Sequence, residues 1–511
     1  MNIHQSALPI LIVAAPLFTS FVLPVLGWWK RAAVFPVTLA ALAFCGGASI
    51  VAAREVLATG PIHYFLGGWA PPWGIEFRID HLGVVMLLLL SFITFLVGIY
   101  SKRSIARELP EPDQEVPFYT VYLLLVSGLM GIVVTADMFN LYVFLEITSL
   151  SSYALIAVGG GVAVVSAFRY VILGTVGAAF YLLAVGYLYS VTGSLNMADL
   201  ATILPDLYDS NAVRVGFACM VIGLSIKMAL FPMHAWLPGA YSDAPSAVSA
   251  LLAATTTKVA AYALVRVVFF VFEPRFSVEI IPVTALLSWM GAIAMIVGST
   301  MAIAQSDLKR MLAYSSVAQI GYIVLGVSLA NAMGLTAGLF HLINHSVMKA
   351  CLFLVAGSIV YRTGLRKIHE LRNLSAKMPW TAAAFSVVAF SMIGIPPTAG
   401  FFSKLYLILG AINAEQWVFV GVILLSSILA LAYFVNVIRY MYLSPDKAET
   451  GTATTTGGQP VAIPEPQRDE APVSMLVPML ILAVSVVLLG LFNGEIVSRF
   501  LDPVVPASFS R

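Results

Sequence analysis

The chain has 511 residues, of which 60% are hydrophobic and only 10% are charged. Soluble globular proteins carry roughly 25% charged residues. A chain this long and this apolar cannot cover itself with polar surface in water, so it needs the hydrocarbon core of a bilayer as its solvent. The formal net charge of +2 gives no reason to expect a nucleic-acid partner. Cys45, Cys219 and Cys351 lie in apolar runs without metal-ligand spacing, so we expect no metal site.

Apolar runs of about 20 residues, separated by short polar segments, predict about fourteen membrane-spanning helices and therefore an all-α polytopic membrane protein. The run at 378–412 is long enough to be a broken helix. The runs lie near residues 8–29, 33–53, 81–100, 117–135, 138–158, 164–192, 212–231, 246–272, 281–304, 310–330, 332–361, 378–412, 417–443 and 474–494.

Two connecting segments have a composition of their own. Within an N-terminal unit at 1–110, residues 54–80 alternate in polarity and suggest a short hairpin on the outer face. Residues 446–472 are rich in Thr, Gly, Pro and Glu, which predicts a cytoplasmic linker before a C-terminal helix within 474–511.

The distribution of basic residues predicts the orientation in the membrane. If the N-terminus lies outside, the inside loops hold more than twice as many Lys and Arg residues as the outside loops. Because cytoplasmic loops carry an excess of Lys and Arg, both termini are expected on the outer side of a bacterial cytoplasmic membrane.

Two segments depart from the pattern of a plain spanning helix. One contains Pro232 and Pro238, and the other contains Pro396 and Pro397. Proline frees backbone carbonyls, which in lipid must be satisfied by protein or water. One such break alone is most simply a proline kink. Two breaks at corresponding places in two halves, each close to a lysine, indicate an ion path between inverted repeats.

Several ionisable residues fall inside predicted spans, where each charge costs about 2.5–3.5 kcal/mol on insertion scales. A lone buried histidine is more often a packing residue, but an acid, lysines and a histidine pair on separate helices indicate a proton relay. A lysine whose acidic partner approaches or withdraws can hold or release a proton, and histidine titrates near neutrality. The candidate relay residues are Glu146, Lys227, Lys258, His341, His345 and Lys404, with Lys349 one turn beyond His345 as a possible secondary residue.

The remaining polar residues have plainer interpretations. His234 lies in the first break and could serve an access path. Asp137 is expected to cap a helix, with a possible secondary role, and Asp243 is expected to cap the helix that follows it. Arg266 lies near a predicted helix end and can extend its side chain to the membrane surface. A loop cluster is expected from Asp307, Lys309 and Arg310.

Four segments resemble the antiporter-like subunits shared by respiratory complex I and Mrp antiporters. They are residues 139–146, 227–238, 307–316 and 341–350, within a resemblance that covers roughly residues 80–445. The resemblance implies two inverted five-helix repeats, near 117–272 and 281–443, each with one broken helix. It also implies roles along the relay: Glu146 as the family's key acid, Lys227 as its partner, Lys258 as the central lysine, His341 and His345 on the histidine-bearing helix, and Lys404 at the second break.

Within this family the chain looks most like the D subunit of Mrp-type multisubunit sodium/proton antiporters. The stretch 139–157 carries much of that likeness, and Lys404 stands where one complex I subunit has glutamate. The chain also ends soon after its fourteenth predicted helix, without the lateral helix of the largest complex I subunit. Gln319 stands where some relatives have histidine, and we assign it no proton role.

The expected function is therefore proton translocation in a hetero-oligomeric sodium/proton antiporter, a secondary transporter and not an enzyme. No nucleotide motif, redox motif or cofactor site is visible in the sequence. The alternative is the proton-channel subunit of NADH:quinone oxidoreductase or a membrane-bound hydrogenase, with electron carriers on partner chains. An assembly scaffold without ion flux is a third possibility, which the buried charges disfavour.

Overall fold

The computed structural model describes residues 6–109, 111–443 and 468–509. Eleven segments of this part are long and apolar enough to cross a membrane, and the first of them joins two helices, α1 and α2. The unbroken spans are α1 (Leu8–Lys30), α2 (Val34–Thr59), α3 (His81–Glu108), α4 (Glu115–Val134), α5 (Met138–Ala157), α6 (Val162–Thr192), α10 (Ser246–Arg266), α11 (Val283–Ile303), α12 (Leu308–Ser328), α13 (Ala332–Thr363), α17 (Trp417–Leu443) and α18 (Val473–Leu491).

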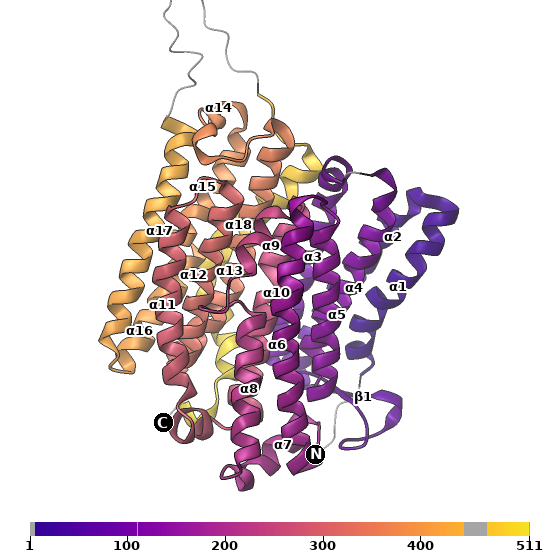
Figure 1. Cartoon of the computed structure of the whole chain (residues 1–511), viewed down its shortest axis with the longest axis vertical. Helices are drawn as coiled ribbons and strands as arrows, with labels where there is room; N and C mark the ends of the chain where they lie inside the picture. Colours follow the sequence, from indigo (N-terminus) through magenta and orange to yellow (C-terminus); the bar gives the residue numbers. More distant parts are fainter. Residues whose placement is uncertain (1–5, 110, 444–467, 510–511) are drawn as a thin grey trace, which may run out of the picture.

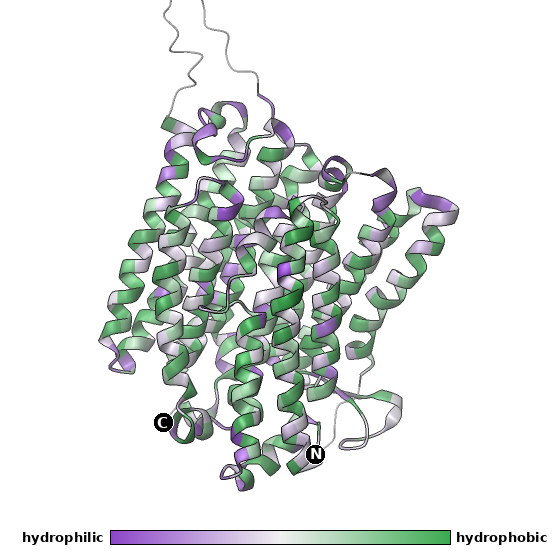
Figure 2. Ribbon diagram, in the orientation of Figure 1, coloured by the Kyte–Doolittle hydropathy of each residue, from purple (hydrophilic) through white to green (hydrophobic). Residues whose placement is uncertain are grey.

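Two further spans are each made of two half-helices, so the described residues contain the fourteen expected. The broken spans are α8 (Asn211–Lys227) with α9 (Leu237–Asp243), and α15 (Pro379–Ile393) with α16 (Ala399–Asn413). Short helices α7 (Met197–Ile203), α14 (Leu374–Lys377) and α19 (Asn493–Ile496) lie at the ends of the bundle. Hydrophobic residues predominate along the spans, and hydrophilic residues gather toward the two ends, with a few inside (Figure 2).

The first break follows from the local sequence. Helix α8 ends at Lys227, and residues 228–236 form turns before α9 begins with Pro238 in its first turn. Pro232 has no backbone N–H to continue a helix. The indole of Trp236 donates to the carbonyl of Ile226 at 3.0 Å, which satisfies one of the acceptors that the break frees.

The second break is shorter and is fixed by glycine. Helix α15 ends at Ile393, and Gly394 adopts φ = +98°, a conformation that L side chains rarely adopt. Residues 394–398, which include Pro396 and Pro397, separate it from α16. The carbonyls that this break frees are used by a side chain of the site.

The two broken spans run in opposite directions. In Figure 1, α8 lies below α9, whereas α15 lies above α16. Each sits among equivalent neighbours, because α8 packs on α6 and α10 as the α15–α16 pair packs on α13 and α17. The fold is thus an all-helical membrane bundle with two inverted five-helix repeats, each with one broken span. Their limits near 117–272 and 281–443 remain predictions.

The predicted hairpin is present at the lower end of the bundle in Figure 1, where both termini lie. Strands β1 (Ile62–Phe65) and β2 (Glu76–Ile79) pair antiparallel. Burial would raise the pKa of Glu76, but hydrogen bonds from His63 and Asn196 hold that pKa below its ordinary value. The hairpin is therefore tied to the segment that leads into α7.

Most of the predicted linker at 446–472 lies outside the described residues. Its described end is attached to the bundle, because Glu470 accepts hydrogen bonds from the backbone N–H groups of Trp380 and Thr381 at 2.7 and 3.1 Å. A carboxylate at this place caps the start of α15.

Candidate proton path inside the bundle

The first predicted pair is formed. Lys227, the last residue of α8, donates to Glu146 of α5 at 3.0 Å and to the hydroxyl of Ser149 at 2.7 Å. The side chain of Lys227 is 4% exposed and that of Glu146 is 25% exposed. The break after Lys227 leaves the ammonium at mid-span, where the acid from a neighbouring helix meets it.

Lys258 lies at the centre of the molecule and is fully buried. Its ammonium donates to the carbonyl of Ala253 and to the hydroxyl of Thr257, both on its own helix α10. No described carboxylate forms an ion pair with it. The amine therefore points along α10 toward that helix's N-terminal end, as long side chains on helices do.

The histidine pair lies on the face of α13 that packs against α10 and α16. The two rings are 6.2 Å apart. His341 bonds Ser403 of α16 at 2.9 Å through Nδ1 and Gln319 of α12 at 2.8 Å through Nε2. His345 is buried, and among the described residues neither of its ring nitrogens has a partner. His341 is thus fixed in orientation, while His345 has spare donor and acceptor capacity.

Gln319, to which the sequence analysis assigned no proton role, contacts His341, and the sequence did not indicate this contact. Its spacing to His341 corresponds to no helical repeat, because the two residues lie on different helices, α12 and α13. The signal available in the sequence was a buried amide inside an apolar helix, since such a group needs a partner.

Lys349 continues the histidine face, as predicted. Its ammonium donates to the carbonyl of Leu312 and to the hydroxyl of Ser315, both on α12. Lys258 is close enough to interact electrostatically with His345 and Lys349. The lysines of α10 and α13 therefore face the same buried polar region.

Lys404 lies in α16, and its ammonium reaches the second break. It donates to the freed carbonyls of Met392 and Ile393 at 2.9 Å each and to Ser427 of α17 at 3.1 Å. Its ammonium also lies 4.9 Å from the ring centroid of Tyr322, a cation–π distance. This lysine is held by neutral oxygens and an aromatic face.

Two of the three secondary candidates, Asp137 and His234, lie away from these buried groups. Asp137 caps α5 by accepting from the N–H of Asn140 at 2.7 Å, as the capping interpretation predicts. His234 is partly exposed in the first break, and its Nδ1 has no described partner. Pro238 lies at the start of α9 and not within the gap itself.

Asp243 was expected to cap the next helix, and this is wrong. It is the last residue of α9, where it accepts from Ser166 at 2.6 Å. Glu108 of α3 accepts from the N–H of Ser246 at 2.7 Å and so caps α10 in its place. Pro245 separates Asp243 from α10 and keeps the aspartate from its first turn.

Two basic residues also differ from expectation. Arg266 does not extend to the membrane surface but pairs with Asp80 inside the protein, with side chains 13% and 14% exposed. Lys309 is not a loop residue, because it lies buried in α12 and donates to the carbonyl of Ala244 at 2.9 Å. Arg366 donates nearby to the carbonyl of Ser242 at 3.1 Å. Lys309 and Arg366, both from the second repeat, thus bind the end of α9 and the residue that follows it.

The arrangement provides a row of ionisable groups across packed helices. Helix α8 contacts α10, α10 contacts α13, and α13 contacts α16. Along that order lie the Glu146–Lys227 pair, Lys258, the histidines and Lys404. Serine hydroxyls contact three of these groups and can both donate and accept a proton. Within the described residues, no cluster of three or more His, Cys, Asp or Glu side chains could hold a metal ion.

Comparison with known proteins places this architecture in a family. Residues 135–430 match the family described as NADH:quinone oxidoreductase/Mrp antiporter, TM. NADH-quinone oxidoreductase subunit N of Desulforudis audaxviator (strain MP104C) is 47% identical over 98% of this chain and 98% of its own length. The D subunit of the Na(+)/H(+) antiporter of Alkalihalophilus pseudofirmus (strain ATCC BAA-2126 / JCM 17055 / OF4) is 30% identical over 89% and 90%.

Solved structures of multisubunit membrane complexes contain chains with the same fold. A chain of the archaeal membrane-bound sulfane sulfur reductase superposes with a TM-score of 0.88 at 29% identity, covering 98% of this chain and 97% of that one. A chain of the Mrp complex from Dietzia sp. DQ12-45-1b gives 0.85 at 28% identity, with the same coverage. The chain therefore belongs to the family of antiporter-like membrane subunits shared by NADH:quinone oxidoreductases and Mrp antiporters.

Proposed function

We propose that this chain is a proton-translocating subunit of a hetero-oligomeric complex in the cytoplasmic membrane. Protons move along Glu146, Lys227, Lys258, the histidines and Lys404. The observation that carries the proposal is the set of buried ionisable side chains at both breaks and on the helices between them. Such groups are expensive in a membrane and mark proton relays.

Each end of the row has a physical means of changing its protonation. At the first break, Lys227 and Glu146 can separate if α8 moves relative to α5, and the lysine then loses its counter-ion. At the second break, Lys404 depends on carbonyls whose positions are set by the turn at Gly394. Movement of either break therefore alters how strongly a buried ammonium is stabilised.

Two complexes are candidate hosts for the chain. The relative called NADH-quinone oxidoreductase subunit N, 47% identical over nearly the whole chain, supports a redox-driven proton pump with electron carriers on partner chains. The relative from the Na(+)/H(+) antiporter and the Mrp complex structure support a sodium/proton antiporter. We rank the redox-driven host first because its relative is the more similar of the two.

The orientation is part of the proposal. Both termini lie at one end of the bundle in Figure 1, and α17, the last described helix before the predicted linker, ends at the opposite end. The basic loops gather at the linker end, which we assign to the cytoplasm, and the termini to the outer side.

The test uses inverted vesicles from a host that lacks antiporters and carries the full gene cluster, with assembly checked by co-purification. Quinone-dependent acidification of the vesicle interior without a sodium response supports the redox-driven host. Sodium-dependent pH change without an electron donor supports the antiporter. Glu146→Ala should abolish either activity in an assembled complex, whereas Glu415→Gln, at an exposed loop carboxylate, should not. Unchanged proton movement in the Glu146→Ala variant would refute the proposed relay.

A further inference from the structure

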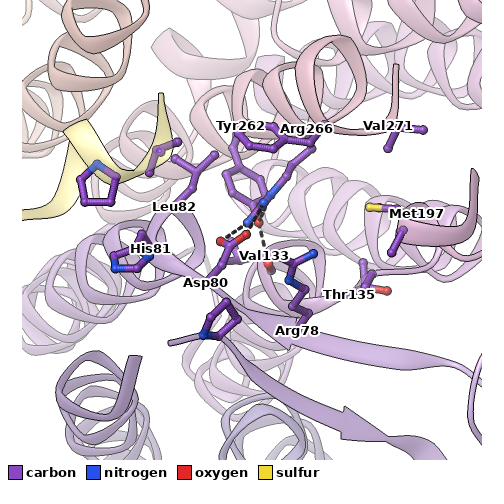
Figure 3. A pocket seen from close by; sticks show the side chains of 16 residues that line it. Arg78, Asp80, His81, Leu82, Val133, Thr135, Met197, Tyr262, Arg266 and Val271 are labelled. Atoms are coloured by element: carbon purple, nitrogen blue, oxygen red, sulfur yellow. Dashed lines mark hydrogen bonds and ion pairs between the residues drawn. The ribbon is translucent and has the colours of Figure 1, made fainter. Parts of the chain in front are cut away.

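A cavity of about 390 Å³ opens at the end of the bundle that carries both termini. It is lined by the start of α3, the ends of α4 and α10, the start of α7, and Pro503 and Val504 near the C-terminus. Figure 3 shows Arg78, Asp80, Tyr262 and Arg266 grouped within it. The volume is large enough for several waters, since one water occupies about 30 Å³ in the liquid.

The polar wall of the cavity is a buried ion pair. The two terminal guanidinium nitrogens of Arg266 donate to the two carboxylate oxygens of Asp80, and Asp80 also accepts from the N–H of Gly83 at 3.0 Å. Burial would raise the pKa of Asp80, but Arg266 holds that pKa well below its ordinary value. Asp80 therefore stays charged, and the pair closes this side of the cavity.

A hydroxyl links the ion pair to the interior. Arg266 Nε donates to the hydroxyl of Tyr262 at 3.0 Å, and that hydroxyl donates to the carbonyl of Val133 at 2.7 Å. Lys258, Tyr262 and Arg266 follow one another at intervals of four residues on α10, so they share one face. Each interval spans about 6 Å along the helix. The central lysine thus lies one turn above a hydroxyl that borders the cavity.

A purely structural interpretation is that Asp80 and Arg266 clamp β2 and α3 to the end of α10. A clamp does not account for a cavity of this size. It also does not require a buried tyrosine hydroxyl in line with the central lysine. These two features together favour an access path.

We propose that this cavity is the vestibule through which the proton path reaches the aqueous phase at the termini-bearing end, with Tyr262 and the Asp80–Arg266 pair as its closure. The inference rests on the proposed function. When the path opens, the Lys258 ammonium gives a proton to a vestibule water, leaving a neutral amine and a hydronium that exchanges with bulk water. The described structure is the closed state, because Lys258 points to Ala253, away from the vestibule.

The first test is chemical access, which does not depend on transport. Met197→Cys places a thiol on the cavity wall, and Thr59→Cys places one at an exposed position on the same end of the bundle. The three native cysteines are buried and give little background. The full complex, in intact cells and in inverted vesicles, is treated with a membrane-impermeant cationic methanethiosulfonate.

We expect both variants to be labelled in cells and neither in inverted vesicles, and only labelled M197C to lose proton movement, by at least about tenfold. An unlabelled M197C, or a labelled one with unchanged transport, would overturn the vestibule. If the unlabelled complex moves no protons at all, the proposed function fails. The labelling pattern then still tests the cavity, because an M197C that is unreactive in cells refutes an aqueous vestibule.

The second test separates the closure from a clamp. Tyr262→Phe removes only the hydroxyl, and the matched control Tyr122→Phe removes a buried hydroxyl that donates to the carbonyl of Thr94 at 2.6 Å, away from the cavity. We expect Y262F to slow proton movement by at least about tenfold and Y122F to leave it unchanged, with similar melting temperatures. Equal transport in the two variants would show that Tyr262 only supports the fold.

Discussion

The two broken helices differ in what holds their lysine. At the first break, Lys227 has a carboxylate partner from another helix, Glu146, at 3.0 Å. At the second break, Lys404 has no described carboxylate and is held by two carbonyls of its own break and by Ser427. Both inverted repeats therefore contain a broken helix, but they stabilise the buried lysine with different partners.

The difference shows two uses of a helix break. The break can place a lysine against a carboxylate on another helix, or its own free carbonyls can bind the lysine. A full charge at 4 Å contributes about 4 kcal/mol at the effective dielectric of a protein surface, and a carbonyl dipole contributes less. The first lysine is thus governed by the distance to another helix, whereas the second is governed by the conformation of its own turn.

Lys227→Arg should have the largest effect. Arginine keeps the pair with Glu146 but does not release its proton in proteins. We expect proton movement to fall at least about tenfold while the complex stays assembled. The measurement is vesicle pH change, with Lys102→Arg at an exposed position as the control. Wild-type rates in K227R would show that Lys227 is only a counter-ion.

The second prediction compares the loss of stability when the lysine at each break is replaced by methionine. Lys227→Met leaves a carboxylate without its cation, which costs about 3 kcal/mol when such a pair is buried and less here, because Glu146 is partly exposed. Lys404→Met leaves only neutral oxygens, at a cost of about 1 kcal/mol each, and this cost is offset because the substitution also removes a buried ammonium that has no described counter-ion. The unfolding temperature of the purified complex should therefore fall further for K227M. The reverse order would contradict the comparison.

Ser427→Asp should make the second break resemble the first. The new carboxylate lies within reach of Lys404, which would then hold its proton as an ion pair. We expect proton movement to slow several-fold, with a higher unfolding temperature than that of Ser427→Asn, the uncharged control of the same shape. Identical rates in the two variants would mean that a counter-ion at this break has no influence.

Gln319→Leu should have the smallest effect. It removes the partner of His341 Nε2, a hydrogen bond worth about 1 kcal/mol, while Ser403 still holds Nδ1. We expect Gln319→Leu to reduce the rate of proton movement about two- to fivefold. Gln319→Glu should reduce this rate less than Gln319→Leu does. A loss as large as that of K227R would place Gln319 directly on the path.

Much of the fold could be predicted from the sequence because each span is a continuous apolar run, and each break carries proline beside an ionisable residue. The Glu146–Lys227 pair needed the family resemblance, since nothing local connects residues 81 positions apart. The spacing of His341 and His345 placed them correctly on one face, because helical periodicity alone decides this.

The errors occurred where a partner comes from a distant segment. Arg266 was expected to reach the membrane surface, but its partner Asp80 lies 186 positions earlier in the chain. Asp243 was expected to be a helix cap, but Glu108 takes that role from 138 positions away. Gln319 was given no proton role because it stands where some relatives have histidine, and its contact with His341 joins two helices. Local spacing gives no information about such pairs.

The cations that bind the C-terminal end of α9 have a consequence for engineering. Lys309 and Arg366 belong to the second repeat, and they hold the carbonyls of Ala244 and Ser242 in the first. A chimera that exchanges only one repeat with a relative would separate these donors from their acceptors. Chimeras between family members should therefore take Lys309, Arg366 and the segment from Ser242 to Ser246 from the same parent.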